Sequence, residues 1–195
     1  MSKKDEILEA TYILFAEEGY NLSMADIAKK VNLKVPSIYS HFQSKEELVD
    51  QVIEKELNQY FNILEEKIIF LNDNETQIEE KLRKLCQFIC AYYREPLKIR
   101  FWKYVFLNYN EEVRIKSGNI VNNKNQNIKI LMKRIYEEGS KKNQIKSEAL
   151  DGIIYLYLTM IQGILDYLLL NEDMEEESVK IANTVWQAYW NGIKK

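Results

Sequence analysis

The chain has 195 residues, of which 46% are hydrophobic and 29% charged, a length that can bury a sizeable core and a composition that argues against disorder and fibrous repeats. Its 6 glycines and 2 prolines are too few for the turns of a sandwich or a barrel, so the composition favours an all-α fold. The formal net charge of −3 argues against a strongly basic nucleic-acid binder when the chain is taken as a whole.

The chain opens with signals for two short helices. Apolar residues at helical spacing predict a first helix over residues 3–18, and Gly19 supplies its end. Ser23, followed three residues later by Asp26, resembles a capping box, which predicts the start of a second helix. The apolar face of this second helix continues only to Val31.

A third and a fourth helix follow closely. Pro36 fits the first turn of a helix that is expected to end near His41, and residues 32–33 form a tight connection before it. Ser44 and Glu47 form a capping box for a fourth helix. Three short helices within about 40 residues, with a tight turn between the second and the third, are typical of a helix-turn-helix domain.

The rest of the chain has the apolar periodicity of longer helices. The fourth helix is expected to run to about residue 71, and the residues predicted to face inward on it are Leu48, Val52, Leu57, Tyr60, Phe61, Leu64 and Ile68. Asparagine, glycine and proline breaks then separate helices over about 75–93, 96–108, 111–138, 148–170 and 176–193. The Asn-rich stretch 119–127 is polar enough to fray in part.

Four pieces of the N-terminal sequence resemble the TetR family of bacterial transcriptional repressors and fall at the family's spacing. These pieces are residues 7–20, 23–28, 37–42 and 44–48. The resemblance implies an all-α protein of about nine helices, with a helix-turn-helix DNA-binding domain over 1–47 joined by a long helix to a helical effector-binding and dimerisation domain over 48–195. It also implies a sequence-specific transcriptional regulator, a ligand-released repressor that acts as a homodimer on a palindromic operator.

The third helix carries the residues expected to contact DNA. A helix in the major groove presents its N-terminal side chains to base edges, while neighbouring groups hold the phosphates. The start of the second helix and the lysine that opens the fourth add phosphate contacts. The predicted DNA-binding residues are Ser23, Met24, Lys34, Val35, Ser37, Tyr39, Ser40, His41 and Lys45. As alternatives, Ser23 serves only as a cap and Tyr39 packs partly in the core.

The charge of this region favours DNA binding only locally. Residues 1–50 carry 6 lysines against 9 acidic residues, but the segment from Asn21 to Lys45 carries 4 lysines against Asp26 alone. The acidic residues cluster on the first helix and just after Lys45, where they can face away from DNA. We therefore expect a small contact surface with modest nonspecific affinity and a strong salt dependence.

The aromatic-rich stretch 88–109 has two interpretations. In an arbitrary helical protein such density is more often core, whereas the resemblance implies middle helices that enclose an effector cavity. The effector would then be a hydrophobic or aromatic small molecule, oriented by a few polar groups. The predicted pocket residues are Phe88, Tyr92, Phe101, Trp102, Val105, Gln162 and Asp166.

The last two predicted helices have more apolar surface than one chain readily covers. The helix over 148–170 is apolar nearly all round, and the helix over 176–193 has one wide apolar face. They are either buried within the monomer or form a four-helix dimer interface, where Gly152 and Gly163 permit close approach. The predicted interface residues are Ile154, Leu158, Ile161, Leu165, Val185, Trp186 and Tyr189.

Other kinds of site have little support in the sequence. Cys86 and Cys90 are expected to be reduced and buried, and the single histidine, His41, lacks partners for a metal site or for catalysis. We therefore predict no cofactor, no metal and no enzyme. A helical hydrolase or transferase without obvious motifs and an interaction module that has lost DNA binding are the alternatives. The amphipathic start, and Asp166 within the longest apolar run, argue against a signal peptide and a membrane span, so we expect a cytoplasmic protein.

Overall fold

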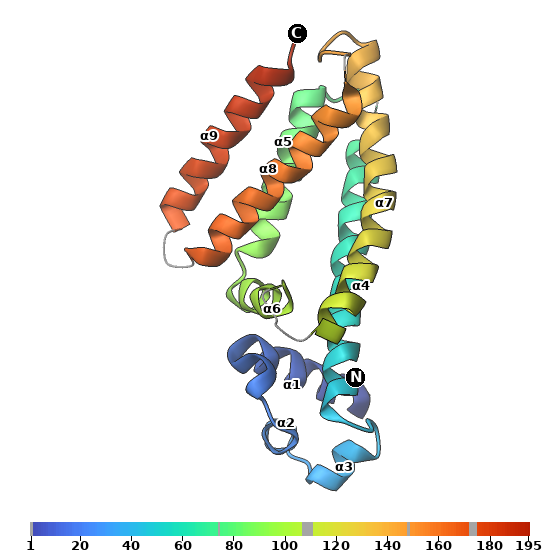
Figure 1. Ribbon diagram of the computed structural model, residues 1–195, viewed down its shortest axis with the longest axis vertical. Coiled ribbons are helices and arrows are strands. Elements are labelled where there is room, and N and C mark those ends of the chain that lie inside the picture. Colours follow the sequence, from blue (N-terminus) through green and yellow to red (C-terminus); the bar gives the residue numbers. More distant parts are fainter. Residues whose placement is uncertain (1, 74, 107–110, 148, 172–174) are drawn as a thin grey trace. The chain divides into compact units, whose positions relative to one another are not determined.

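The computed structural model describes residues 2–73, 75–106, 111–147, 149–171 and 175–195 (Figure 1). Within these residues the fold is all-α, as predicted, and the sole strand-like pairing there is an isolated bridge between Ile145 and Lys194. The helices are α1 (Lys3–Glu18), α2 (Met24–Lys30), α3 (Val35–Tyr39), α4 (Lys45–Leu71), α5 (Ile78–Tyr93), α6 (Pro96–Phe106), α7 (Glu111–Lys141), α8 (Leu150–Leu170) and α9 (Glu175–Ile193), with a 3-10 turn over Gly19–Asn21.

The chain folds into two compact units, each made of two segments. The first unit comprises Met1–Tyr60 and Pro96–Asn122, and the second comprises Phe61–Glu95 and Asn123–Lys195. The chain passes between the units within α4, between α5 and α6, and within α7. This structural division differs from the functional division at residue 47, which stays a prediction.

Helix starts in the first unit follow from local hydrogen bonds. At α2, the Ser23 hydroxyl accepts the Asp26 N–H at 3.2 Å while the Asp26 carboxylate accepts the Ser23 N–H at 3.0 Å. This reciprocal pair confirms the predicted capping box. At α4, the Ser44 hydroxyl accepts the Glu47 N–H at 3.1 Å, but the Glu47 carboxylate accepts the N–H of Gln43, at 2.7 Å.

The tight connection after α2 is a left-handed helix end. Asn32 has a φ of 54°, which asparagine tolerates better than most residues. The Leu33 N–H donates to the Ala28 carbonyl at 2.8 Å, and the Asn32 N–H donates to the Lys29 carbonyl at 3.2 Å. These two bonds form a Schellman motif, which satisfies the last carbonyls of α2 and turns the chain toward α3.

Helices α1 and α6 pack side by side within the first unit (Figure 1). The Phe101 ring lies 5.1 Å from that of Tyr12 and 5.4 Å from that of Phe15, between centroids. The Tyr104 ring lies 5.9 Å from that of Phe15. Aromatic contacts at these distances add to area burial, so α6 belongs to the same hydrophobic core as α1.

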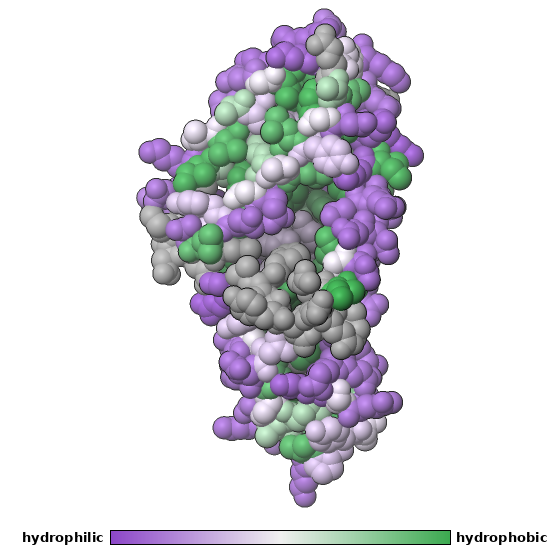
Figure 2. Space-filling view, in the orientation of Figure 1, coloured by the Kyte–Doolittle hydropathy of each residue, from purple (hydrophilic) through white to green (hydrophobic). Residues whose placement is uncertain are grey.

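The second unit has a buried polar cluster inside its helical core. The Tyr136 and Tyr189 hydroxyls share a hydrogen bond of 2.6 Å, and the Tyr157 hydroxyl donates to the Leu82 carbonyl at 2.9 Å. These bonds connect α5, α7, α8 and α9. Hydrophilic side chains cover much of the visible surface, and apolar ones show between them over α8 and α9 (Figure 2).

Two helix boundaries differ from the predicted ones by three residues, the start of α5 and the end of α7. Helix α5 begins at Ile78, later than expected, because the Asp73 carboxylate accepts the N–H groups of Glu75 and Thr76 at 2.9 and 2.6 Å and holds them in a turn. Helix α7 continues through the Asn-rich stretch to Lys141. Just after this end, Asn143 has a φ of 58°, the same left-handed backbone form as at Asn32.

Candidate nucleic-acid interface

Helix α3 is held by its inner face. Ile38 is fully buried and Phe42 is 1% exposed, as expected for core residues one turn apart. Pro36 lies in the first turn and pre-forms the helical backbone. Because the inner residues fix the orientation of this short helix, its remaining side chains point away from the core of the first unit.

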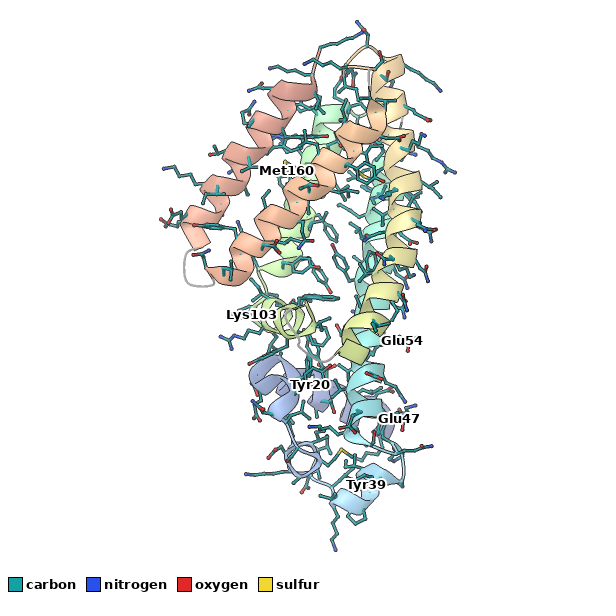
Figure 3. The ribbon with its side chains drawn as sticks, in the orientation of Figure 1. Tyr20, Tyr39, Glu47, Glu54, Lys103 and Met160 are labelled. Carbon is teal, nitrogen blue, oxygen red and sulfur yellow. The ribbon has the colours of Figure 1, made fainter. Side chains whose placement is uncertain are left out.

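The outward side chains of α3 and the residues after it are those predicted to read DNA. Tyr39 is 52% exposed (Figure 3), which leaves about half of its surface for DNA and is also compatible with the alternative that it packs partly in the core. Lys34, Ser40 and His41 are exposed, and Val35 and Ser37 are half-buried. The side chains of Lys34, Tyr39 and His41 make no hydrogen bond or ion pair to any residue that the structure describes. A lysine, a phenol and an imidazole are therefore available on one short segment.

Two of the predicted contact residues also make internal hydrogen bonds. The Ser40 hydroxyl donates to the Ser37 carbonyl at 2.7 Å. The Lys45 ammonium donates to the Tyr20 carbonyl at 3.0 Å, which connects the first turn of α4 to the chain after α1. Lys45 is half-buried, so it positions the start of α4 whether or not it also contacts a phosphate.

The start of α2 offers fewer free hydrogen-bond donors for a phosphate than the sequence suggested. The Ser23 hydroxyl and N–H are both used in the capping box, and the Met24 side chain is 8% exposed. The Met24 N–H lies in the first turn, where the helix itself offers no acceptor. Of these two residues, Met24 therefore keeps the backbone donor that a phosphate could use.

The charged side chains of α2 differ in the partners that they have. The hydroxyl and then the backbone N–H of Ser23 lower the pKa of Asp26 by hydrogen bonding to its carboxylate. Lys30 lies 3.8 Å from the Glu17 carboxylate on α1. Lys29 is exposed at the end of α2 and makes no hydrogen bond or ion pair among the described residues, although its charge also lowers the pKa of Asp26. In the sequence, Lys29 contributes only to the local positive charge. Its exposure could not be predicted, because the exposure of Lys29 depends on how α2 packs.

The residues predicted for an effector pocket are divided between the two units. Phe101, Trp102 and Val105 are buried in the first unit, where Phe101 packs on α1. Phe88 and Tyr92, which are half-buried, belong to the second unit. Gln162 and Asp166 also belong to it; both are exposed and are joined by a hydrogen bond of 2.8 Å. Phe88 stacks beneath the Lys67 ammonium, 5.7 Å from ring centre to nitrogen.

Most residues predicted for a dimer interface lie in the core of the second unit. Ile154, Ile161, Leu165, Trp186 and Tyr189 are buried, and Leu158 and Val185 are half-buried. The exposed side of α8 is formed by other residues, among them Tyr155 and Leu156, which are 55% and 54% exposed. A partner chain on this side would contact these residues first, and dimerisation stays a prediction.

Cys86 and Cys90 are buried free thiols one turn apart on α5, as expected. The hydrogen bond with the neighbouring Cys90 thiol, and then burial, raise the pKa of Cys86. Among the described residues there is no group of three histidine, cysteine or acidic side chains that could hold a metal ion. Nor does any helix in that part of the chain have the length and apolar character needed to cross a membrane.

Similarity to known proteins identifies the family. A family model for the bacterial regulatory proteins of the tetR family matches residues 7–52. IcaR, the negative transcriptional regulator of the icaADBC biofilm operon of Staphylococcus aureus (strain Newman), is 32% identical over 160 residues, 80% of each chain. IcaR of Staphylococcus epidermidis is 37% identical over 62 residues, 31% of this chain and 34% of IcaR.

Solved structures share the fold along nearly the whole chain. A TetR transcription regulator from Haloarcula marismortui has a TM-score of 0.76 at 17% identity and covers 98% of each chain. FadR from Bacillus subtilis, solved with stearoyl-CoA, has a TM-score of 0.73 at 21% identity and covers 98% of this chain and all of FadR. Because 32% identity extends over 80% of both this chain and a curated HTH-type regulator, the chain belongs to the tetR family of bacterial regulatory proteins.

Proposed function

We propose that this transcriptional regulator is a ligand-released repressor that binds a palindromic operator as a homodimer. The observation that carries the proposal is the outward face of α3, where Lys34, Tyr39 and His41 are exposed beside the buried anchors Ile38 and Phe42. A repressor is favoured over an activator because the Staphylococcus aureus relative is a negative regulator.

DNA from upstream of the protein's own gene tests the first part of this proposal. Fluorescence anisotropy should show salt-sensitive binding that exceeds the binding of scrambled DNA of equal length. Tyr39→Ala should weaken this binding at least about tenfold, since it removes the proposed phosphate contact of the Tyr39 hydroxyl. Phe70→Ala, at an exposed aromatic residue of α4 in the second unit (76% against 52%), should bind as the unmodified protein does. Equal affinity for both variants would contradict the assignment of α3.

The dimer is proposed to form through the exposed sides of α8 and α9. A β-carbon on Gly163 would meet no atom within 4 Å, and one on Gly152 would meet only Ala149, so both glycines leave room for a partner helix. Leu156 lies between them on the same exposed side of α8. Isolated large apolar residues at a surface are common, but one flanked by open glycines fits a helix–helix contact.

Sedimentation velocity tests the dimer. Leu156→Glu should shift the protein from dimer to monomer because it would bury a charge at the helix contact. Ile69→Glu is the matched control, since Ile69 is 61% exposed on α4. A monomeric unmodified protein, or a dimer that survives Leu156→Glu, would contradict this interface.

The release step is proposed to work by population shift through α4. This helix contributes Lys45–Tyr60 to the first unit and its remainder to the second. An effector that binds better to one arrangement of α4 must lower DNA affinity by the same coupling factor. Long-chain acyl compounds and aromatic compounds are the first probes, because the effector is expected to be hydrophobic. A compound that binds the C-terminal part and leaves operator affinity unchanged would contradict the mechanism.

A further inference from the structure

The start of α1 carries two neighbouring lysines that have different partners. The Lys3 ammonium donates to the Glu6 carboxylate at 2.6 Å, one turn along the same helix. The Lys4 ammonium instead lies over the ring of Phe42, 5.3 Å from the ring centre. Phe42 belongs to the segment 40–44 that joins α3 to α4, which we call the α3–α4 junction. Lys4 therefore connects α1 to the end of the helix that is proposed to read DNA.

Phe42 anchors the α3–α4 junction in the core of the first unit. Its side chain is 1% exposed, and its N–H donates to the Ile38 carbonyl at 3.1 Å. The N–H of His41 donates to the same carbonyl at 2.9 Å. A shift of the Phe42 ring would therefore move the backbone that carries His41 and the last turn of α3.

The junction is also held from α4. The Glu47 carboxylate accepts the N–H of Gln43 at 2.7 Å and a hydrogen bond from the Gln51 amide at 2.9 Å. Figure 3 shows Glu47 near the start of α4 and Tyr39 at the end of α3, with the junction between them in the chain. Glu47 thus fixes the backbone just after Phe42, whereas Lys4 contacts the Phe42 ring from α1.

The place of Lys4 in the first turn of α1 calls for a compensating partner. A capping box between Ser2 and Asp5 closes this turn, so the Lys4 side chain starts from a fixed backbone. A cation at the start of a helix opposes the helix dipole, and the negative face of an aromatic ring attracts a cation. The Phe42 ring therefore offsets the unfavourable position of the Lys4 charge.

We infer that Lys4 positions α3 for operator binding through Phe42 and does not itself neutralise a phosphate. The inference rests on the proposed function, because it assigns a role in supporting the proposed DNA-binding surface. The Lys4 ammonium holds the Phe42 ring, the ring holds the backbone of the α3–α4 junction, and this backbone sets the direction in which Tyr39 and His41 reach DNA. Lys4 is thus a positioning residue that acts from α1.

Operator binding at several salt concentrations tests this role, and Lys3 provides the matched control. Lys4→Ala should weaken operator binding about two- to fivefold, the effect of one exposed cation–π contact, and leave the slope of log affinity against log salt unchanged. Lys4→Arg keeps the cation and should restore the affinity. Lys3→Ala, which removes the same charge from the same turn, should bind as the unmodified protein does. A slope reduced by about 1 in Lys4→Ala would indicate a phosphate contact and overturn the inference.

Amide hydrogen exchange of the DNA-free protein separates this inference from the proposed function. In Lys4→Ala the N–H groups of His41 and Phe42 should exchange about two- to fivefold faster, whereas Lys3→Ala should leave their exchange unchanged. In a Phe42→Leu background, Lys4→Ala should have no further effect on exchange or affinity. Unchanged exchange in Lys4→Ala, or an effect that persists without the Phe42 ring, would overturn the inference. A protein that shows the exchange difference but binds no operator would contradict the proposed function and keep the Lys4–Phe42 contact.

Discussion

The ring of Tyr104 lies directly against Gly19, where an added β-carbon would stand 2.6 Å from two of the ring carbons. Gly19 has a φ of 61°, so backbone conformation and space both require glycine there. The pair fixes α6 against the end of α1 within the first unit. It thereby connects a helix from the middle of the chain to the helix that supports the DNA-binding segment.

Gly19→Ala should destabilise the protein by about 2–5 kcal/mol, because it combines backbone strain with overpacking against Tyr104. Gly118→Ala is the matched control in the same unit, since a β-carbon there meets nothing within 4 Å. It should stabilise α7 by about 0.5–1 kcal/mol. Urea denaturation followed by circular dichroism measures both, and similar losses in the two variants would contradict the reading of Gly19.

The Lys81–Glu138 pair should matter much more than an exposed pair. The Lys81 side chain is 0% exposed and its ammonium lies 2.9 Å from the Glu138 carboxylate. Glu138→Gln should cost about 3–5 kcal/mol, because it leaves a buried charge uncompensated. Lys84→Met, which breaks the exposed pair with Glu80, should cost about 0.5 kcal/mol or less. Equal losses of unfolding free energy in the two variants would show that other groups compensate the buried charge of Lys81.

Stability should fall in alkali. Burial raises the pKa of Tyr136 and of Tyr189 above the ordinary value, which is about 10. Above that pH the unfolded chain releases these protons while the folded chain keeps them, so stability is lost as pH rises toward the folded-state values. Each phenol contributes up to about 1.4 kcal/mol per pH unit.

Tyr136→Phe should roughly halve this alkaline slope, and Tyr155→Phe, at an exposed tyrosine, should leave it unchanged. Denaturant midpoints between about pH 9.5 and 11.5 measure the difference. A Tyr136→Phe variant with the slope of the unmodified protein would show that other groups govern the alkaline transition.

Acid should loosen the turn before α5. Hydrogen bonds from the Thr76 N–H and hydroxyl, and then from the Glu75 N–H, lower the pKa of Asp73 from 3.8 to about 2. Its contribution to stability is complete above pH 3.8 and is lost as the pH falls toward 2. Asp73→Asn should flatten the dependence of melting temperature on pH within this window. An unchanged dependence would assign acid sensitivity to other carboxylates.

Lys34→Ala should weaken operator binding and reduce the slope of log affinity against log salt by about 1 if Lys34 contacts a phosphate. If it contacts a base edge, selectivity for the operator should fall instead. Lys84→Ala, on α5 in the second unit, serves as the control for loss of one positive charge. Anisotropy titrations at several salt concentrations distinguish these outcomes, and no change in either quantity would remove Lys34 from the interface.

Local chemistry explains why much of the fold could be predicted. The capping box at Ser23, the glycine end at Gly19 and the proline at Pro36 act within a few residues, so the sequence alone predicts the helices they bound. The end of α1 at Glu18 and of α4 at Leu71 are confirmed. Asp73 also acts locally, but the turn that it forms shortens α5, and the apolar periodicity of the sequence does not indicate this turn.

Tertiary relationships could not be predicted in the same way. Nothing near Lys45 in the sequence indicates that its ammonium bonds to the Tyr20 carbonyl, 25 residues away. Apolar periodicity shows that Ile154 and Trp186 are turned inward but not whether they meet their own chain or another. The aromatic stretch after residue 88 is continuous in sequence, yet Phe88 and Phe101 belong to different compact units.

The continuity of α4 and α7 has a consequence for stiffness. Both helices run without a break through the points where the chain passes between the units, Tyr60 to Phe61 and Asn122 to Asn123. An unbroken helix resists bending, whereas asparagine is a poor helix former. We therefore expect the two crossings to differ in stiffness, with α7 bending within its asparagine-rich stretch before α4 bends.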